Sequence, residues 1–74
     1  MKIDYNKFTE DELKVIHNAA RTINYGFGLL FPSHKEQMAL LLENEQFRAI
    51  NQIVHQSYNA LRAIAWKRGE NPDV

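Results

Sequence analysis

Apolar side chains recur at intervals of three and four residues along two long stretches of the chain, and this spacing is the strongest constraint on its fold. The second stretch, residues 47–65, gives an apolar arc roughly 140° wide on a helical wheel. The same spacing places the residues of the first stretch on one face of an α-helix. We therefore predict an all-α fold. The apolar positions of the first stretch are Leu13, Ile16, Ala20, Ile23 and Phe27.

A capping box marks the start of the first predicted helix. Thr9 is followed three residues later by Glu12, a pattern in which each side chain bonds to the other residue's backbone N–H. Two glycines near the end of the apolar pattern are typical of a helix C-terminus. The sequence therefore predicts a helix over Glu10–Asn24, followed by a linker over residues 25–33.

The predicted linker, YGFGLLFPS, is strongly apolar for a loop. Two glycines and a proline argue against a continuous helix. One interpretation, which we favour, is that the loop folds back and fills the core. The other is that it forms a protein-contact patch. Its large apolar residues are Tyr25, Phe27, Leu29, Leu30 and Phe31.

A second capping box, Ser33 with Glu36, predicts a short helix over His34–Glu43. The run Met38–Leu42 covers most of the circumference of this helix. A helix that is apolar nearly all round is usually buried on more than one side. We therefore expect it at the centre of a bundle or at a subunit interface.

The third predicted helix spans Glu45–Arg68 and is the longest. A continuous helix from His34 to Arg68 would be about 50 Å long, and the first helix cannot cover that length. We therefore predict a break or kink near Asn44, which can also cap the third helix. Lys67, Arg68 and the following glycine are typical of a helix C-terminus.

Together these segments predict a small three-helix bundle that occupies residues 1–74 as a single domain. A chain of 74 residues without cysteine has no disulfides to support a small core. We therefore expect dimerisation to complete the bundle, with an interface at Phe27, Leu29, Leu30, Phe31, Met38 and Leu42. The predicted core residues are Leu13, Ile16, Ala20, Ile23, Leu41, Phe47, Ile50, Val54, Leu61 and Ile64.

No carboxylate occurs from Gln46 to Gly69, and this segment carries a charge of +4 although the whole chain is neutral. On the helical wheel, six residues form a stripe opposite the apolar arc. Arg, Trp and amide side chains are typical of binding surfaces. We therefore predict that this stripe binds a partner. Its residues are Arg48, Gln52, His55, Asn59, Arg62 and Trp66.

Trp66 is the least ordinary member of this stripe, because it lies outside the apolar arc. Arg62 lies one turn before it, where a guanidinium can stack on the indole. Alternatively, Tyr5, Phe8 or the apolar linker covers Trp66, and the two interpretations are about equally supported by the sequence.

The sequence offers no catalytic constellation, so we expect a protein that is not an enzyme. There is no cysteine nucleophile, and no pair of histidines has the spacing of a helical zinc site. His17, His34 and His55 lie on three different predicted segments, and His17 reads as a half-buried structural residue. We expect neither metal nor cofactor. The longest aliphatic run is too short to span a bilayer and the N-terminus lacks a signal-peptide pattern, which predicts a soluble cytoplasmic protein without a membrane partner.

Two functions are compatible with these features. The first is a protein-interaction module, namely a regulator, adaptor or inhibitor that binds an acidic partner surface through the third helix. The second, less favoured, is nucleic-acid binding through the Arg, Asn and Gln side chains of that helix. Few basic residues and a pI near 6.8 argue against it. The size also suits a short accessory protein of a phage or other mobile element.

Overall fold

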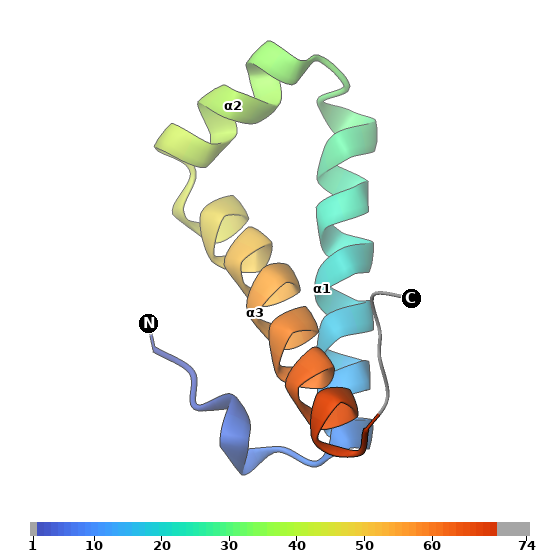
Figure 1. The fold of residues 1–74 in the computed structure, drawn as a ribbon. Coiled ribbons are helices and arrows are strands. Elements are labelled where there is room, and N and C mark those ends of the chain that lie inside the picture. Colours follow the sequence, from blue (N-terminus) through green and yellow to red (C-terminus); the bar gives the residue numbers. More distant parts are fainter. Residues whose placement is uncertain (1, 70–74) are drawn as a thin grey trace.

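The computed structural model describes residues 2–69. Its elements are η1 (Tyr5–Lys7), α1 (Glu10–Leu30), α2 (His34–Glu43) and α3 (Glu45–Lys67). In Figure 1, α1 and α3 run antiparallel as two long arms, and α2 joins their ends at the top. Residues 2–69 contain no β-strand. The predicted all-α fold, with three packed helices of which the third is longest, is therefore confirmed.

The start of α1 follows the predicted capping box. The Thr9 hydroxyl accepts a hydrogen bond from the Glu12 N–H at 3.1 Å, and the Glu12 carboxylate accepts one from the Thr9 N–H at 2.8 Å. These bonds satisfy two backbone donors that a helix N-terminus would otherwise leave without partners.

The end of α1 contradicts the predicted linker. The helix does not stop at Asn24 but continues through Gly26 and Gly28 to Leu30. Neither glycine has a positive φ, so each weakens the helix by about 1 kcal/mol without redirecting the chain. The hydrogen-bond ladder continues until the Phe31 N–H donates to the Phe27 carbonyl at 2.8 Å.

Asn44 separates α2 from α3, as the sequence predicts. Its backbone is extended, with φ −108° and ψ 109°, and its side chain accepts a hydrogen bond from the Phe47 N–H at 2.9 Å. A continuous helix from His34 to Arg68 is therefore excluded. The capping box predicted at Ser33 is wrong, because the Ser33 side chain makes no capping hydrogen bond.

The core lies where α1 packs against α3, and it is narrow. Within the described residues, the buried apolar side chains are Leu13, Ala20 and Phe47. The ring of Phe47 meets Phe27 edge-on, with centroids 4.9 Å apart. The predicted core position Ile23 is wrong, because 48% of this residue is exposed. The other predicted core residues are half-buried, namely Ile16, Leu41, Ile50, Val54, Leu61 and Ile64.

The residues of the predicted linker are divided between the interior and the surface. Phe27 and Phe31 are half-buried, and Phe27 helps to fill the core as predicted. Tyr25, Leu29 and Leu30 are exposed instead. This division follows from the helical conformation, since consecutive residues of a helix point in different directions.

Polar contacts also join the two long helices. Nδ1 of His17 lies 2.9 Å from the hydroxyl of Ser57, which is fully buried. Further along both helices, the Asn24 amide donates to the Asn51 side-chain oxygen at 3.2 Å. His17 is thus a half-buried structural residue, as its place at the edge of the apolar face predicts.

The molecule is more open than a compact domain of its length. The Cα radius of gyration is 14.0 Å, whereas a compact chain of this length has a radius of about 11 Å. The packing gives the reason, because α1 packs mainly against α3 among the helices of residues 2–69. Much of the surface of each helix therefore faces solvent.

Candidate interaction surfaces

The stripe predicted on α3 lies on the side of the helix that turns away from α1. It extends for about 27 Å from Arg48 to Trp66 at 1.5 Å per residue. Its orientation is set by Phe47 and Ser57, which are buried on the opposite side of the helix. Arg62 is half-buried. The exposed members of the stripe are Arg48, Gln52, His55, Asn59 and Trp66.

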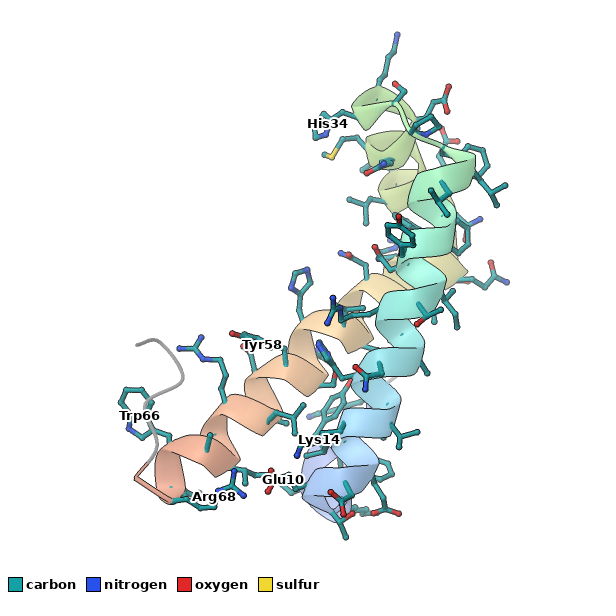
Figure 2. The ribbon with its side chains drawn as sticks, turned by 90° about the vertical axis from the view of Figure 1, so that its right-hand side faces the viewer. Glu10, Lys14, His34, Tyr58, Trp66 and Arg68 are labelled. Carbon is teal, nitrogen blue, oxygen red and sulfur yellow. The ribbon has the colours of Figure 1, made fainter. Side chains whose placement is uncertain are left out.

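Trp66 is 61% exposed, so neither the N-terminal segment nor the predicted linker covers it. Figure 2 shows its ring at the end of α3, pointing away from α1. A shallow hollow beside it is lined by Asn59, Arg62 and Ala63 together with the indole. The alternative in which Tyr5 or Phe8 shields this residue is therefore wrong.

The guanidinium of Arg62 lies over the ring of Tyr58, with Cζ 5.7 Å from the ring centroid. The sequence instead predicts that the Arg62 guanidinium stacks on the indole of Trp66. Tyr58 also contacts the ring of His17, with centroids 5.9 Å apart. These contacts hold a positive charge in a defined place one turn before the C-terminal end of the stripe.

The last turn of α3 is tied to the first turn of α1. Arg68 donates a hydrogen bond to the Glu10 carboxylate, which also pairs with Lys14 at 3.4 Å. The hydrogen bond from Arg68 is the main reason that the pKa of Glu10 lies below its usual value. Figure 2 shows this pair where the two long helices meet. The positive charge of Arg68 in the carboxylate-free segment is therefore matched within the fold.

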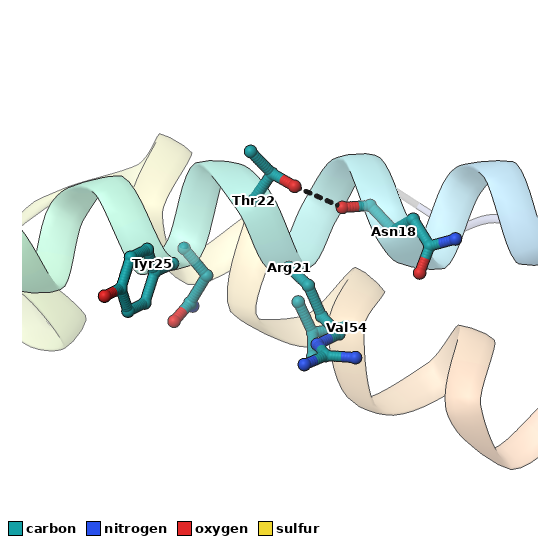
Figure 3. A pocket seen from close by; sticks show the side chains of 6 residues that line it. Asn18, Arg21, Thr22, Tyr25 and Val54 are labelled. Carbon is teal, nitrogen blue, oxygen red and sulfur yellow. Dashed lines mark hydrogen bonds between the residues drawn. The ribbon is translucent and has the colours of Figure 1, made fainter.

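A groove between α1 and α3 adds a cation that the sequence did not reveal. Figure 3 shows the side chain of Arg21 beside Val54 of α3. Arg21 has no ion pair within residues 2–69. The wheel of α3 could not identify it, because Arg21 belongs to the other helix. The remaining residues that line the groove are Asn18, Thr22, Asn24 and Tyr25.

The six residues predicted for an oligomer interface fall into two groups. Phe27 and Phe31 are half-buried inside the fold. The other four are exposed: Leu29 and Leu30 lie on α1, and Met38 and Leu42 on α2. Leu42 is 78% exposed, the highest value among the large apolar residues. The chain alone therefore leaves α2 apolar on its outer side.

Within residues 2–69, no cluster of three His, Cys, Asp or Glu side chains is arranged to hold a metal ion. None of the described helices combines the length and apolarity needed to cross a membrane. Comparison of the chain with protein-family models, with curated proteins and with solved structures found no match. The surfaces described above are therefore the basis for a functional proposal.

Proposed function

We propose that this chain is a non-catalytic protein-interaction module, a regulator, adaptor or inhibitor, that acts as a homodimer. The proposed binding surface for its partner is the α3 stripe. One observation carries the proposal: Trp66 is 61% exposed at the end of a helix that has no carboxylate after Glu45. An exposed tryptophan costs solvation free energy that burial in a complex recovers.

The residue types of the stripe support a protein partner with an acidic surface. Trp and Arg are over-represented among the residues that contribute most to protein–protein binding. Arg48 and Arg62 supply positive charge on α3, and Arg21 adds to it from α1. Carboxylates on the same face would repel an acidic partner, so their absence favours this pairing.

Nucleic-acid binding is supported less. Affinity for a polyanion grows with the number of phosphate contacts made by Lys and Arg. Arg68 already pairs with Glu10, so a phosphate contact by this residue would have to compete with a carboxylate of the same chain. The neutral net charge of the chain adds no general attraction to nucleic acid.

The homodimer is supported by the exposed apolar side chains of α1. Leu29 is 67% exposed and Leu30 is 73% exposed. The buried core is small by comparison, since only Leu13, Ala20 and Phe47 are buried apolar residues within the described range. Covering this exposed surface with a second chain would stabilise the fold.

A pull-down from lysate of the source cells, with and without nuclease, tests the partner. We expect wild type to retain a protein after nuclease treatment and the Arg48→Glu/Trp66→Ala variant to lose it. Lys35→Glu is the matched control, because it makes an equal charge change on α2, away from the stripe. Equal retention by the double variant would refute the stripe as the site. Loss on nuclease treatment alone would favour nucleic acid.

A further inference from the structure

We infer that a second copy of this chain docks on the outer face of α1, with the two α1 helices antiparallel. This inference rests on the proposed homodimer and names the surface and orientation that form it. The outer face consists of Val15, Ala19, Thr22, Gly26, Leu29 and Leu30, on the side of α1 opposite Leu13 and Ala20.

The outer face has the residue spacing of a helix-packing seam. Val15, Ala19, Thr22, Gly26 and Leu29 follow one another at intervals of four, three, four and three residues. This is the spacing that keeps side chains in line between two nearly parallel or antiparallel helices. Charge is also absent from it: the charged residue between Val15 and Leu30 is Arg21, which points to the α3 groove.

The large apolar residues of this face remain uncovered in the single chain. Val15 is 68% exposed, and Leu29 and Leu30 are 67% and 73% exposed. Ile23, at the edge of the face, is 48% exposed. A helix of 21 residues therefore carries apolar side chains on two opposite sides, and α3 covers one of them.

Gly26 has no role within the single chain that requires glycine. Its φ is not positive, and a Cβ added to it would meet no atom within 4 Å. Glycine at this position weakens the helix by about 1 kcal/mol relative to alanine. A small residue on a seam lets a second helix approach closely, so a docked helix accounts for it.

The two ends of the face complement each other. At the N-terminal end of α1, a largely apolar hollow is lined by Phe8, Val15 and Ile16 together with Asp11 and Glu12. At the C-terminal end, Leu29 and Leu30 are exposed. Because a two-fold axis presents the same surface on both partners, an antiparallel copy would bring the leucines of each chain to the hollow of the other.

One antiparallel register fits this complementarity. It places Val15 opposite the partner's Gly26 and Ala19 opposite the partner's Thr22, so each of these two layers combines a larger with a smaller residue. The same register places Leu29 opposite the partner's Glu12, beside the hollow. A parallel pair would set Val15 on Val15 and Gly26 on Gly26, which alternates crowding with gaps.

Charge also favours the antiparallel orientation. The first turn of α1 contains Glu10, Asp11 and Glu12, and its last turn contains no basic residue. A parallel pair would bring two such acidic turns together. In the antiparallel register the two copies of Glu12 lie about 26 Å apart along the axis, well beyond the screening length of about 8 Å at physiological salt.

The exposed area is large enough for such an interface. The whole chain exposes 5871 Å², whereas a compact protein of this mass exposes about 4,700 Å². A standard interface takes about 800 Å² from each partner. The area that a docked partner would cover on this chain is therefore smaller than the difference between its exposed area and that of a compact protein of the same mass.

Single-cysteine variants test the register, because the chain has no cysteine of its own. Ala19→Cys and Thr22→Cys lie next to the two-fold axis and should form disulfide-linked dimers on mild oxidation. We expect rates on the order of a hundredfold above that of Gln52→Cys, which lies on the α3 stripe, because docking raises the local thiol concentration. Val15→Cys alone should not cross-link, but an equimolar mixture of Val15→Cys and Gly26→Cys should.

Cross-linking of Val15→Cys alone at the rate of Ala19→Cys would instead show a parallel pair. A homodimer in which neither Ala19→Cys nor Thr22→Cys cross-links would overturn the docking face and leave the homodimer standing. If wild type sediments as a monomer from micromolar to millimolar concentrations, the homodimer and the docking face both fail. The α3 stripe would still be tested separately by Arg48→Glu.

A second pair of variants separates α1 from α2 as the docking surface. Leu29→Asp should weaken the dimer about 100-fold or more, because it buries a carboxylate in an apolar seam. Leu42 on α2 is even more exposed than Leu29, and Leu42→Asp should leave the dissociation constant within about threefold, because exposed charges contribute little. The opposite ranking in analytical ultracentrifugation would assign the interface to α2 and overturn the inference.

Discussion

His17 of α1 donates a hydrogen bond from Nδ1 to the hydroxyl oxygen of Ser57 on α3, at 2.9 Å. The direction follows from the second bond of Ser57, whose hydroxyl donates to the Ile53 carbonyl at 2.6 Å. A hydroxyl has one hydrogen to donate, so the hydrogen in the bond to His17 must come from the imidazole. This contact fixes the position of α1 along α3 at the centre of a small core.

Ser57→Ala should lower the free energy of unfolding by about 1–3 kcal/mol, because it leaves the half-buried His17 Nδ1 without its partner. Urea denaturation followed by circular dichroism measures the change. Tyr5→Phe is the matched control for loss of a hydroxyl. The Tyr5 hydroxyl is buried without a hydrogen-bond partner in the described part of the chain, and burial raises its pKa. Its removal should be neutral or stabilising. An equal loss in both variants would contradict the role of the His17 bond.

The two residues predicted as caps of α2 and α3 should differ in their contribution to stability. Asn44→Ala removes the hydrogen bond to the Phe47 N–H and should cost about 0.5–2 kcal/mol. Ser33→Ala should change stability by less than about 0.5 kcal/mol, because the Ser33 side chain makes no capping bond. Thermal melts of the two variants at one protein concentration give the comparison. A Ser33→Ala cost equal to that of Asn44→Ala would show that Ser33 caps α2 in solution.

Two apolar residues on opposite sides of α1 should respond differently to truncation. Leu13 is 1% exposed and Val15 is 68% exposed. Leu13→Ala should cost about 2–5 kcal/mol by opening a cavity in the core. Val15→Ala should cost less than about 0.5 kcal/mol in the monomer. Denaturation at low micromolar and at millimolar protein concentration separates the two effects. Val15→Ala should have a lower free energy of unfolding than wild type only at the concentration where the chain is dimeric.

The Glu10–Arg68 pair should make stability depend on pH. Because the folded state lowers the pKa of Glu10, the stabilisation is present above the carboxylate's pKa in the unfolded chain. It is lost as the pH falls through the pKa of the folded state. The melting temperature of Glu10→Gln should therefore lie below that of wild type at pH 7, and the difference should shrink towards pH 3. Glu43→Gln, a carboxylate at the end of α2, serves as the control. A constant difference across this range would contradict the linkage.

The local signals of the sequence were sufficient for most helix boundaries. The bonds of Thr9 and Asn44 depend on residues three positions away, so a short window of sequence contains both partners. The end of α1 could not be predicted in this way. Gly26 and Gly28 weaken the helix locally, but the contact of Phe27 with Phe47 lies 20 positions further along the chain. Long-range packing therefore favours the continuation of α1 past the two glycines, whereas its end at Leu30 fits the local effect of Pro32, which disfavours a helical conformation at Phe31.

The candidate surfaces also divide into features that local sequence predicts and features that depend on packing between helices. The exposure of the α3 stripe followed from the wheel of one helix, because α1 covers the opposite side. The position of Arg21 beside Val54 depends on how two helices pack, so no pattern within either helix contains it. The outer face of α1 follows from neither pattern, because the spacing from Leu13 to Phe27 identifies one apolar side of this helix and Val15 belongs to a second.

The two opposite sides of α1 also bear on how such a chain can change over generations. A substitution at Leu13 or Ala20 acts on folding, whereas one at Val15 or Leu30 leaves the packing of α1 on α3 intact. Selection on one side is thus largely independent of selection on the other. A lineage of such proteins can therefore acquire new binding specificities on its exposed helix surface while the packing between α1 and α3 is preserved.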